Sequence, residues 1–61
     1  APVTIGDGAV IGGGSVVQPG CKIGKGAVVA SRAVLPKWTE VPDGEVWGGI
    51  PARFIKRVGE D

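Results

Sequence analysis

The segment IGDGAVIGGGSVV, residues 5–17, contains five glycines among thirteen residues. Such a segment is compatible with a phosphate-binding loop, a flexible linker or one part of a repeat. A phosphate loop ends in Gly-Lys-Ser/Thr between a strand and a helix, and the residues around Gly12, Gly13 and Gly14 do not match that context. A flexible linker does not place valine and isoleucine at a constant spacing. The segment is therefore interpreted as part of a repeat.

An apolar residue recurs at every sixth position from residue 5 to residue 47. The residues at this position are Ile5, Ile11, Val17, Ile23, Val29, Leu35, Val41 and Trp47. Glycine stands three residues later in five of the repeats, where a sharp turn with positive φ is easiest for glycine. Valine and isoleucine favour extended backbone, so the period indicates a short strand and a turn in each repeat. This pattern predicts a β-helix.

The pattern [Ile/Val/Leu]-Gly-x-Gly-[small]-Val resembles the hexapeptide repeat of left-handed parallel β-helix proteins, from residue 3 to about residue 58. The resemblance implies an all-β fold with left-handed crossovers, in which three hexapeptides form one triangular coil. One coil is expected over 5–22, a second over 23–40 and most of a third over 41–52. The resemblance then implies three inward columns, which are Ile5, Ile23 and Val41; Ile11, Val29 and Trp47; and Val17 and Leu35.

The end of the chain departs from the regular pattern. LPKWTEVPD, residues 35–43, contains two prolines and predicts a loop. Pro51 suits the first turn of a helix, the apolar residues 54, 55 and 58 share one helical face, and Gly59 suits the helix end. We therefore expect one hexapeptide-repeat domain over 1–61. Its expected parts are regular coils over 1–36, a loop and the last strands over 37–50, and a short C-terminal α-helix over 51–59 that covers the open end of the coils.

The segment VPDGEVWGGIPARFIKRV, residues 41–58, is similar to the C-terminal part of hexapeptide acyltransferases that O-acetylate sugars or polysaccharides. This resemblance implies a homotrimer that holds acetyl-CoA in a groove between neighbouring β-helices and transfers the acetyl group to a sugar or polysaccharide hydroxyl. Ile50 stands where the family most often has asparagine. Residues 36–43 also form a longer segment than the family's, which leaves the phase of the repeat after Leu35 open.

The family's general base is a histidine, whose pKa lies near neutrality. This chain contains no histidine, so no catalytic residue is assigned and the chain alone is expected to be inactive. The resemblance does imply residues that bind coenzyme A, with small residues beside the pantetheine arm and cations or tail residues near the nucleotide. These residues are Gly12, Gly13, Ala30, Ser31, Lys37, Pro51, Ala52, Arg53 and Lys56. The alternative is that the small residues only form turns and that the cations only face solvent.

Two other functions remain open. A γ-class carbonic anhydrase has a similar tail but needs three zinc-binding histidines, and a non-catalytic β-helix module needs none. Three single residues are also notable. Cys21 is expected to be a buried, inert thiol and Arg32 to face solvent, whereas Trp38 is expected either to stack on adenine or, preferably, to pack at a subunit interface.

Composition narrows the functional classes. The chain has 61 residues, a net charge of +1 and one cysteine, so it has no internal disulfide and no strongly basic surface for nucleic acid. Its acidic residues are scattered, so no metal is expected. So short a domain is marginally stable alone, which favours oligomerisation. No apolar run is long enough to span a membrane and no signal peptide is recognised, so a cytoplasmic location is expected.

Overall fold

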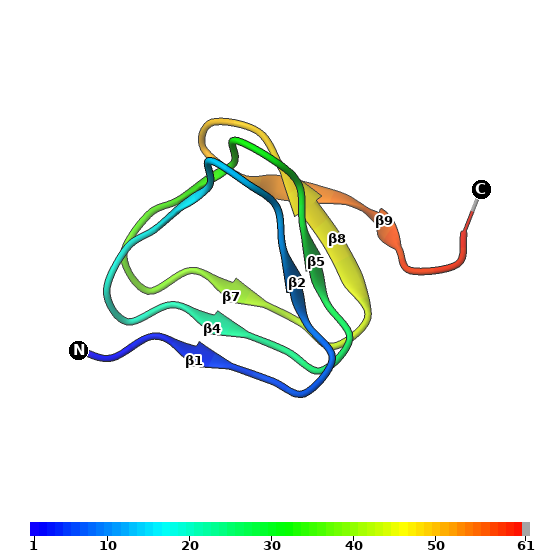
Figure 1. Cartoon of the computed structure of the whole chain (residues 1–61), viewed down its shortest axis with the longest axis horizontal. Helices are drawn as coiled ribbons and strands as arrows, with labels where there is room; N and C mark the ends of the chain where they lie inside the picture. Colours follow the sequence, from blue (N-terminus) through cyan, green and yellow to red (C-terminus); the bar gives the residue numbers. More distant parts are fainter. Residues whose placement is uncertain (61) are drawn as a thin grey trace.

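The computed structural model describes residues 1–60, and every regular element in that part of the chain is a β-strand (Figure 1). The strands are β1 (Thr4–Ile5), β2 (Val10–Ile11), β3 (Val16–Val17), β4 (Lys22–Ile23), β5 (Val28–Val29), β6 (Val34–Leu35), β7 (Glu40–Val41), β8 (Glu45–Gly48) and β9 (Arg53–Arg57). Within residues 1–60 there is no helix long and apolar enough to cross a membrane.

The first eight strands form the three sides of a triangular coil, in which each strand from β1 to β5 pairs in parallel with the strand three places later (Figure 1). The sides are β1-β4-β7, β2-β5-β8 and β3-β6. Their registers align the residues of the three expected columns: Ile5 with Ile23 and Val41, Ile11 with Val29 and Trp47, and Val17 with Leu35. The column predictions are therefore confirmed.

The repeat continues without a change of phase beyond Leu35. Val41 pairs with Ile23 as the unbroken period requires, so the segment that was expected to be a loop forms an ordinary corner followed by β7. Pro36 and Pro42 both stand directly after an inward strand residue, where the chain turns away from the sheet. Proline fits there because its fixed φ suits a turn.

The core lies inside the triangle and consists of inward strand residues together with small residues that directly precede a strand. The buried hydrophobic residues are Cys21, Ile23, Ala27, Val29, Ala33, Leu35, Val41 and Ala52. Alternation along each strand leaves the neighbouring residue on the outer surface. Ile5 is 52% exposed whereas Ile23 is 2% exposed, because the first coil has a neighbouring coil on one side only. Cys21 is buried as expected, and its Sγ donates to the Pro36 carbonyl at 3.1 Å.

The prediction of a helix over 51–59 is wrong. Residues 53–57 form β9, which runs antiparallel to β8, with Glu45 opposite Arg57 and Gly48 opposite Arg53 (Figure 1). The free edge of β8 offers a row of backbone partners, whereas a helix of nine residues is marginal on its own. The aromatic and β-branched residues of this segment also suit a strand. Tertiary pairing therefore overrides the helical spacing.

Candidate functional site

The turns between strands stack into three corners of the triangle. The charged corner comprises residues 6–8, 24–26 and 42–44. The small-residue corner comprises 12–14, 30–32 and 48–50, and the lysine–tryptophan corner comprises 18–20 and 36–38. Four of the expected coenzyme-binding residues, Gly12, Gly13, Ala30 and Ser31, share the small-residue corner, because the sheet register brings successive coils into line.

Backbone hydrogen bonds hold the small-residue corner tightly from coil to coil. The Gly12 N–H donates to the Val29 carbonyl at 2.7 Å, and the Arg32 N–H donates to the Gly13 carbonyl at 3.0 Å. A Cβ on Gly12 would meet the backbone of Ser31, including its Cα at 2.7 Å. Such a contact is far below van der Waals distance, so close stacking by itself requires glycine at position 12.

Gly13 has no such structural requirement. A Cβ at this position would have no atom within 4 Å, and the backbone does not adopt positive φ. Each of the other glycines, all of which lie in the described residues, either adopts positive φ or would bring a Cβ within 3.0 Å of another atom. Gly13 is thus the single glycine that neither the turn nor the packing explains.

The other corners show that this position tolerates large side chains. The equivalent residues are Asp7, Lys25 and Asp43 at the charged corner and Pro19 and Lys37 at the lysine–tryptophan corner. At the small-residue corner, Gly13 is followed by Ser31 in the next coil. At this position small residues therefore occur at one corner only, although the coil geometry does not require one at Gly13.

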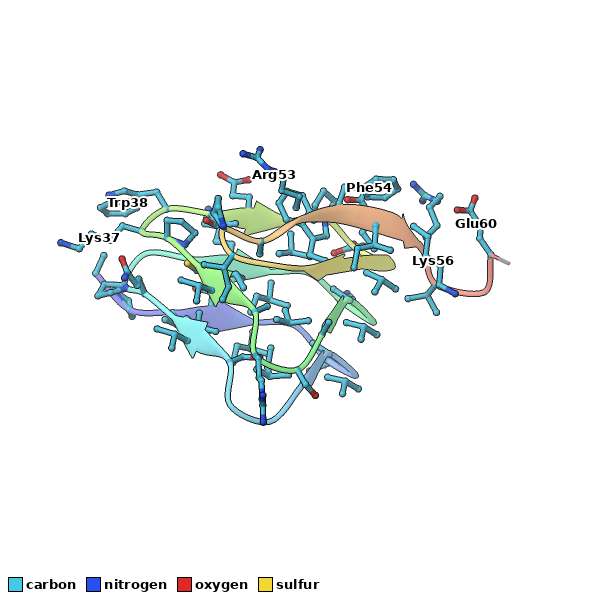
Figure 2. The ribbon with its side chains drawn as sticks, turned by 90° about the horizontal axis from the view of Figure 1, so that it is seen from above. Lys37, Trp38, Arg53, Phe54, Lys56 and Glu60 are labelled. Atoms are coloured by element: carbon cyan, nitrogen blue, oxygen red, sulfur yellow. The ribbon has the colours of Figure 1, made fainter. Side chains whose placement is uncertain are left out.

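The remaining expected residues are distributed over the molecule. Arg53 lies opposite Gly48 and therefore beside the small-residue corner, together with exposed Pro51 and buried Ala52, whose N–H donates to the Val34 carbonyl at 2.8 Å. Lys37 lies at the next corner and Lys56 near the far end of β9, on opposite sides of Arg53 (Figure 2). Lys56 Nζ donates to the Glu60 carbonyl at 2.9 Å.

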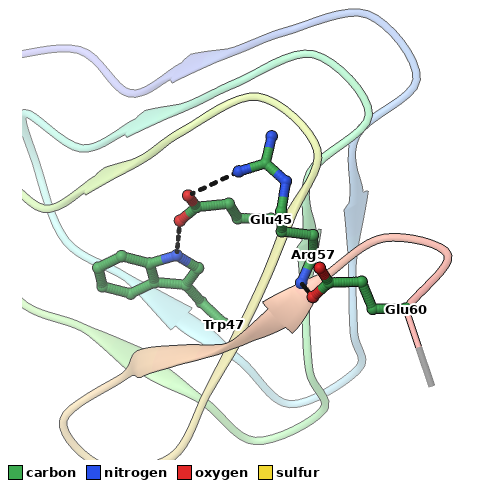
Figure 3. Close-up of polar contacts among 4 residues, drawn as sticks. All are labelled: Glu45, Trp47, Arg57 and Glu60. Carbon is green, nitrogen blue, oxygen red and sulfur yellow. Dashed lines mark hydrogen bonds and ion pairs between the residues drawn. The ribbon is translucent and has the colours of Figure 1, made fainter.

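A polar contact that the sequence analysis missed joins β8 to β9 (Figure 3). Glu45 accepts a hydrogen bond from Trp47 Nε1 at 2.9 Å through Oε1, and its Oε2 lies 3.8 Å from Arg57 Nη1. Arg57 thus has an acidic partner within the chain. The i, i+2 spacing of Glu45 and Trp47 places both on one side of a strand, and that spacing is the signal that was available.

The described part of the chain encloses no pocket. It also contains no group of three His, Cys, Asp or Glu residues that could hold a metal ion. The candidate site is consequently an open surface, formed by the small-residue corner with Arg53 beside it. A small ligand on this surface would be enclosed only if a second molecule covered it.

A sequence model of one family, described as bacterial transferase hexapeptide (six repeats), matches residues 2–37, which is more than half of the chain. The chain belongs to this family. The hexapeptide transferase family accounts for the repeat and the stacked corners, and the fold is the left-handed parallel β-helix that the sequence resemblance implied.

Solved structures and curated proteins agree with this family. A hexapeptide transferase family protein from Anaplasma phagocytophilum has a TM-score of 0.91 at 33% identity, covering 95% of this chain and 35% of that one. A maltose O-acetyltransferase from Clostridium difficile 630 has a TM-score of 0.87 at 40% identity, covering 98% and 31%. These similarities support membership of a family that includes acetyltransferases.

Two curated relatives differ in their reactions. A 2,3,4,5-tetrahydropyridine-2,6-dicarboxylate N-acetyltransferase from Alkaliphilus metalliredigens is 51% identical over 97% of this chain. The mitochondrial gamma carbonic anhydrase 1 of Arabidopsis thaliana is 38% identical over 95% of this chain. The chain spans only 24% and 21% of the lengths of these two relatives.

Proposed function

We propose that this chain is the coenzyme-binding part of an acetyl-CoA-dependent O-acyltransferase that acts on a sugar or polysaccharide hydroxyl. The similarity to a maltose O-acetyltransferase over 98% of the chain supports both the donor and the acceptor class. The similarity to an N-acetyltransferase supports acetyl-CoA as the donor, and we expect other parts of the protein to select the acceptor. We propose a homotrimer in the cytoplasm.

The observation that carries the proposal is the open space beside the backbone of Gly13. Large residues occupy the equivalent position at other corners, so the absence of a side chain at Gly13 is not a requirement of the coil. An open backbone surface is what the thin, flexible pantetheine arm needs for close approach. Ser31 stands above Gly13 in the next coil and adds a hydroxyl without filling the surface.

The neighbouring residues fit the rest of the coenzyme. Coenzyme A carries phosphates, and Arg53 beside the corner is an exposed guanidinium that forms charge-assisted hydrogen bonds with such groups. Arg57 is a poorer candidate because its guanidinium already faces Glu45. Acetyl-CoA itself supplies the activated thioester. These residues bind and orient the coenzyme, while the general base for the acceptor hydroxyl is expected outside this chain, which has no histidine.

The proposed trimer supplies the second wall of the site. The described residues enclose no pocket, and binding sites for small ligands are concave. A neighbouring β-helix placed against the small-residue corner would convert the open surface into a groove. In this arrangement the coenzyme contacts two protomers, so binding and association are expected to depend on each other.

A carbonic anhydrase is the second candidate, favoured by the 38% identity to the Arabidopsis relative. That reaction needs a zinc ion held by histidines, all of which must then come from outside this chain. A non-catalytic β-helix module needs neither zinc nor coenzyme. The three functions therefore predict different ligands. Only the acyltransferase predicts that a bulky side chain at Gly13 blocks the binding of coenzyme A.

The test replaces Gly13 with leucine and measures coenzyme A binding by isothermal titration calorimetry. Asp7→Leu is the matched control, because Asp7 occupies the equivalent position at the charged corner of the same coil. We expect Gly13→Leu to weaken binding at least tenfold and Asp7→Leu to leave it unchanged, with equal thermal stability of the two variants. Unaltered coenzyme binding by Gly13→Leu, or no binding by the parent protein, would contradict the proposal.

A further inference from the structure

The strand β9 is the last strand of the sheet β2-β5-β8-β9 and has a neighbouring strand on one edge only. Figure 2 shows it beyond β8, at the end of the stack of coils. It is the longest strand in the described part of the chain, with five residues, and all five are exposed. The edge that faces away from β8 therefore presents backbone groups that no other strand within residues 1–60 pairs with.

The backbone N–H of Arg57 is directed to this outer edge. The next N–H along the chain, that of Val58, donates to the Gly44 carbonyl at 2.6 Å on the side of β8. Successive N–H groups of an extended chain point to opposite edges, so the Arg57 N–H points away from β8. It donates to Oε1 of Glu60 at 2.9 Å (Figure 3). A carboxylate thus already occupies the outer edge at this point.

The main chain of Glu60 contacts the same edge. Its N–H donates to the Arg57 carbonyl at 3.1 Å, and its carbonyl accepts a hydrogen bond from Lys56 Nζ at 2.9 Å. These are the groups that an acidic residue of an added strand would offer to β9. Hydrogen bonds between exposed groups contribute little net free energy, because water replaces them. A segment that pairs with more of β9 can therefore displace Glu60.

The side chains of β9 are of two kinds. Phe54 and Ile55 are large and apolar, and they are 51% and 55% exposed. The other three residues are the cations Arg53, Lys56 and Arg57. A segment of alternating apolar and acidic residues would pack on the first kind and neutralise the second. A second copy of β9 would instead set cation against cation, because antiparallel pairing centred on Ile55 places Arg53 opposite Arg57.

We propose that the outer edge of β9 is a docking site for an extended acidic segment of another protein. This segment adds to the sheet as a strand and takes the place of Glu60. Strand addition draws its affinity from main-chain hydrogen bonds and its specificity from the neighbouring side chains. In the free protein, Glu60 covers part of the edge and so limits pairing with other strands. The docking site holds for any reaction of the protein, because the fold alone defines this edge.

The test titrates the protein with a short amidated peptide of alternating valine and glutamate, followed by amide NMR and calorimetry. The same peptide N-methylated at every residue is the first control, because it keeps the charges and lacks the N–H groups. A peptide of alternating valine and lysine is the second control. We expect only the unmethylated acidic peptide to bind and to shift the amide signals of β9. Equal binding of the methylated peptide would overturn the proposal, as would the absence of binding by all three.

Two variants of β9 and its cover test which groups are used. Glu60→Ala frees the Arg57 N–H and is expected to tighten binding of the acidic peptide about threefold to tenfold, whereas Glu40→Ala, which removes the same charge from β7, leaves binding unchanged. Lys56→Glu is expected to weaken binding about tenfold, with Lys22→Glu in β4 as its control. Equal affinities within either pair of variants would contradict the proposal.

Hydrogen exchange of the Arg57 amide distinguishes an acidic partner from a second copy of the chain. In Glu60→Ala this amide is expected to exchange rapidly without peptide and slowly once the acidic peptide is bound. Slow exchange in Glu60→Ala without peptide would show that another copy covers the edge, and it would overturn the proposal.

Discussion

At the scale of single residues, glycine serves three different purposes in this chain. Gly14 and four equivalent glycines adopt positive φ at the corners, and Gly12 makes room for the backbone of the next coil. Gly13 does neither, and the role in coenzyme binding is the one that we propose for it. Three adjacent glycines thus have different roles, which depend on their backbone conformation and on the atoms that surround them.

Gly12→Ala is expected to destabilise the protein by about 1–3 kcal/mol, because the added Cβ would push against the Ser31 backbone. Gly13→Ala is the control, and its methyl group meets nothing within 4 Å. Urea unfolding followed by circular dichroism measures both variants. Equal stability of the two would show that the coils separate more easily than the structure indicates.

At the scale of elements, β9 depends on its contacts with β8. The two strands pair antiparallel, with an irregularity between Val46 and Trp47, and Glu45 connects the Trp47 indole to Arg57 (Figure 3). Arg57 is largely exposed, so the ion pair contributes little. The hydrogen bond to the partly buried indole is the stronger contact.

Glu45→Ala is expected to lower the free energy of unfolding by about 1–3 kcal/mol, because the Trp47 N–H loses its acceptor. Glu45→Gln keeps an acceptor oxygen and removes only the charge, so its expected loss is below about 1 kcal/mol. Chemical denaturation followed by Trp47 fluorescence in a Trp38→Phe background distinguishes them. The hydrogen bond is not the main contact if both variants lose the same stability.

At the scale of the whole molecule, the three outer faces differ in character. The outward strand residues are Val10, Val28 and Val46 on one face and Val16 and Val34 on a second. On the third face they are Thr4, Lys22 and Glu40. Val10 and Val16 are 56% and 49% exposed. Apolar faces of this kind favour association, so the proposed trimer is expected to use the valine faces and leave the polar face to solvent.

Val10→Lys is therefore expected to reduce the trimer to monomer, because it places an ammonium group in an apolar interface. Thr4→Lys is the matched control, since Thr4 is the equivalent outward residue of the same coil on the polar face. Multi-angle light scattering after size-exclusion chromatography gives the mass of each. A parent protein that is already monomeric, or a Thr4→Lys variant that dissociates equally, would contradict this assignment of faces.

Much of the fold follows from local pattern. The spacing of Ile5, Ile23 and Val41 predicted which residues stack, since a fixed period brings the same position back to the same side of every coil. The period also placed four small residues at one corner. The sequence left the phase after Leu35 open, because two prolines suggest a loop as readily as a pair of corners. It also predicted a helix where β9 forms. The spacing of three apolar residues favours a helix, and it carries no information about the unpaired edge of β8 with which this segment pairs.

By itself the sequence determined the repeat, the inward columns, the family and the corner at which small residues gather. These depend on periodicity, which is a property of the chain alone. Only the tertiary structure decided that residues 53–57 are a strand, that Gly12 is needed for packing whereas Gly13 is not, and that Trp38 lies on Gly20. Each of these depends on which atoms of another coil lie opposite a residue, and those distances exist only once the coils have stacked.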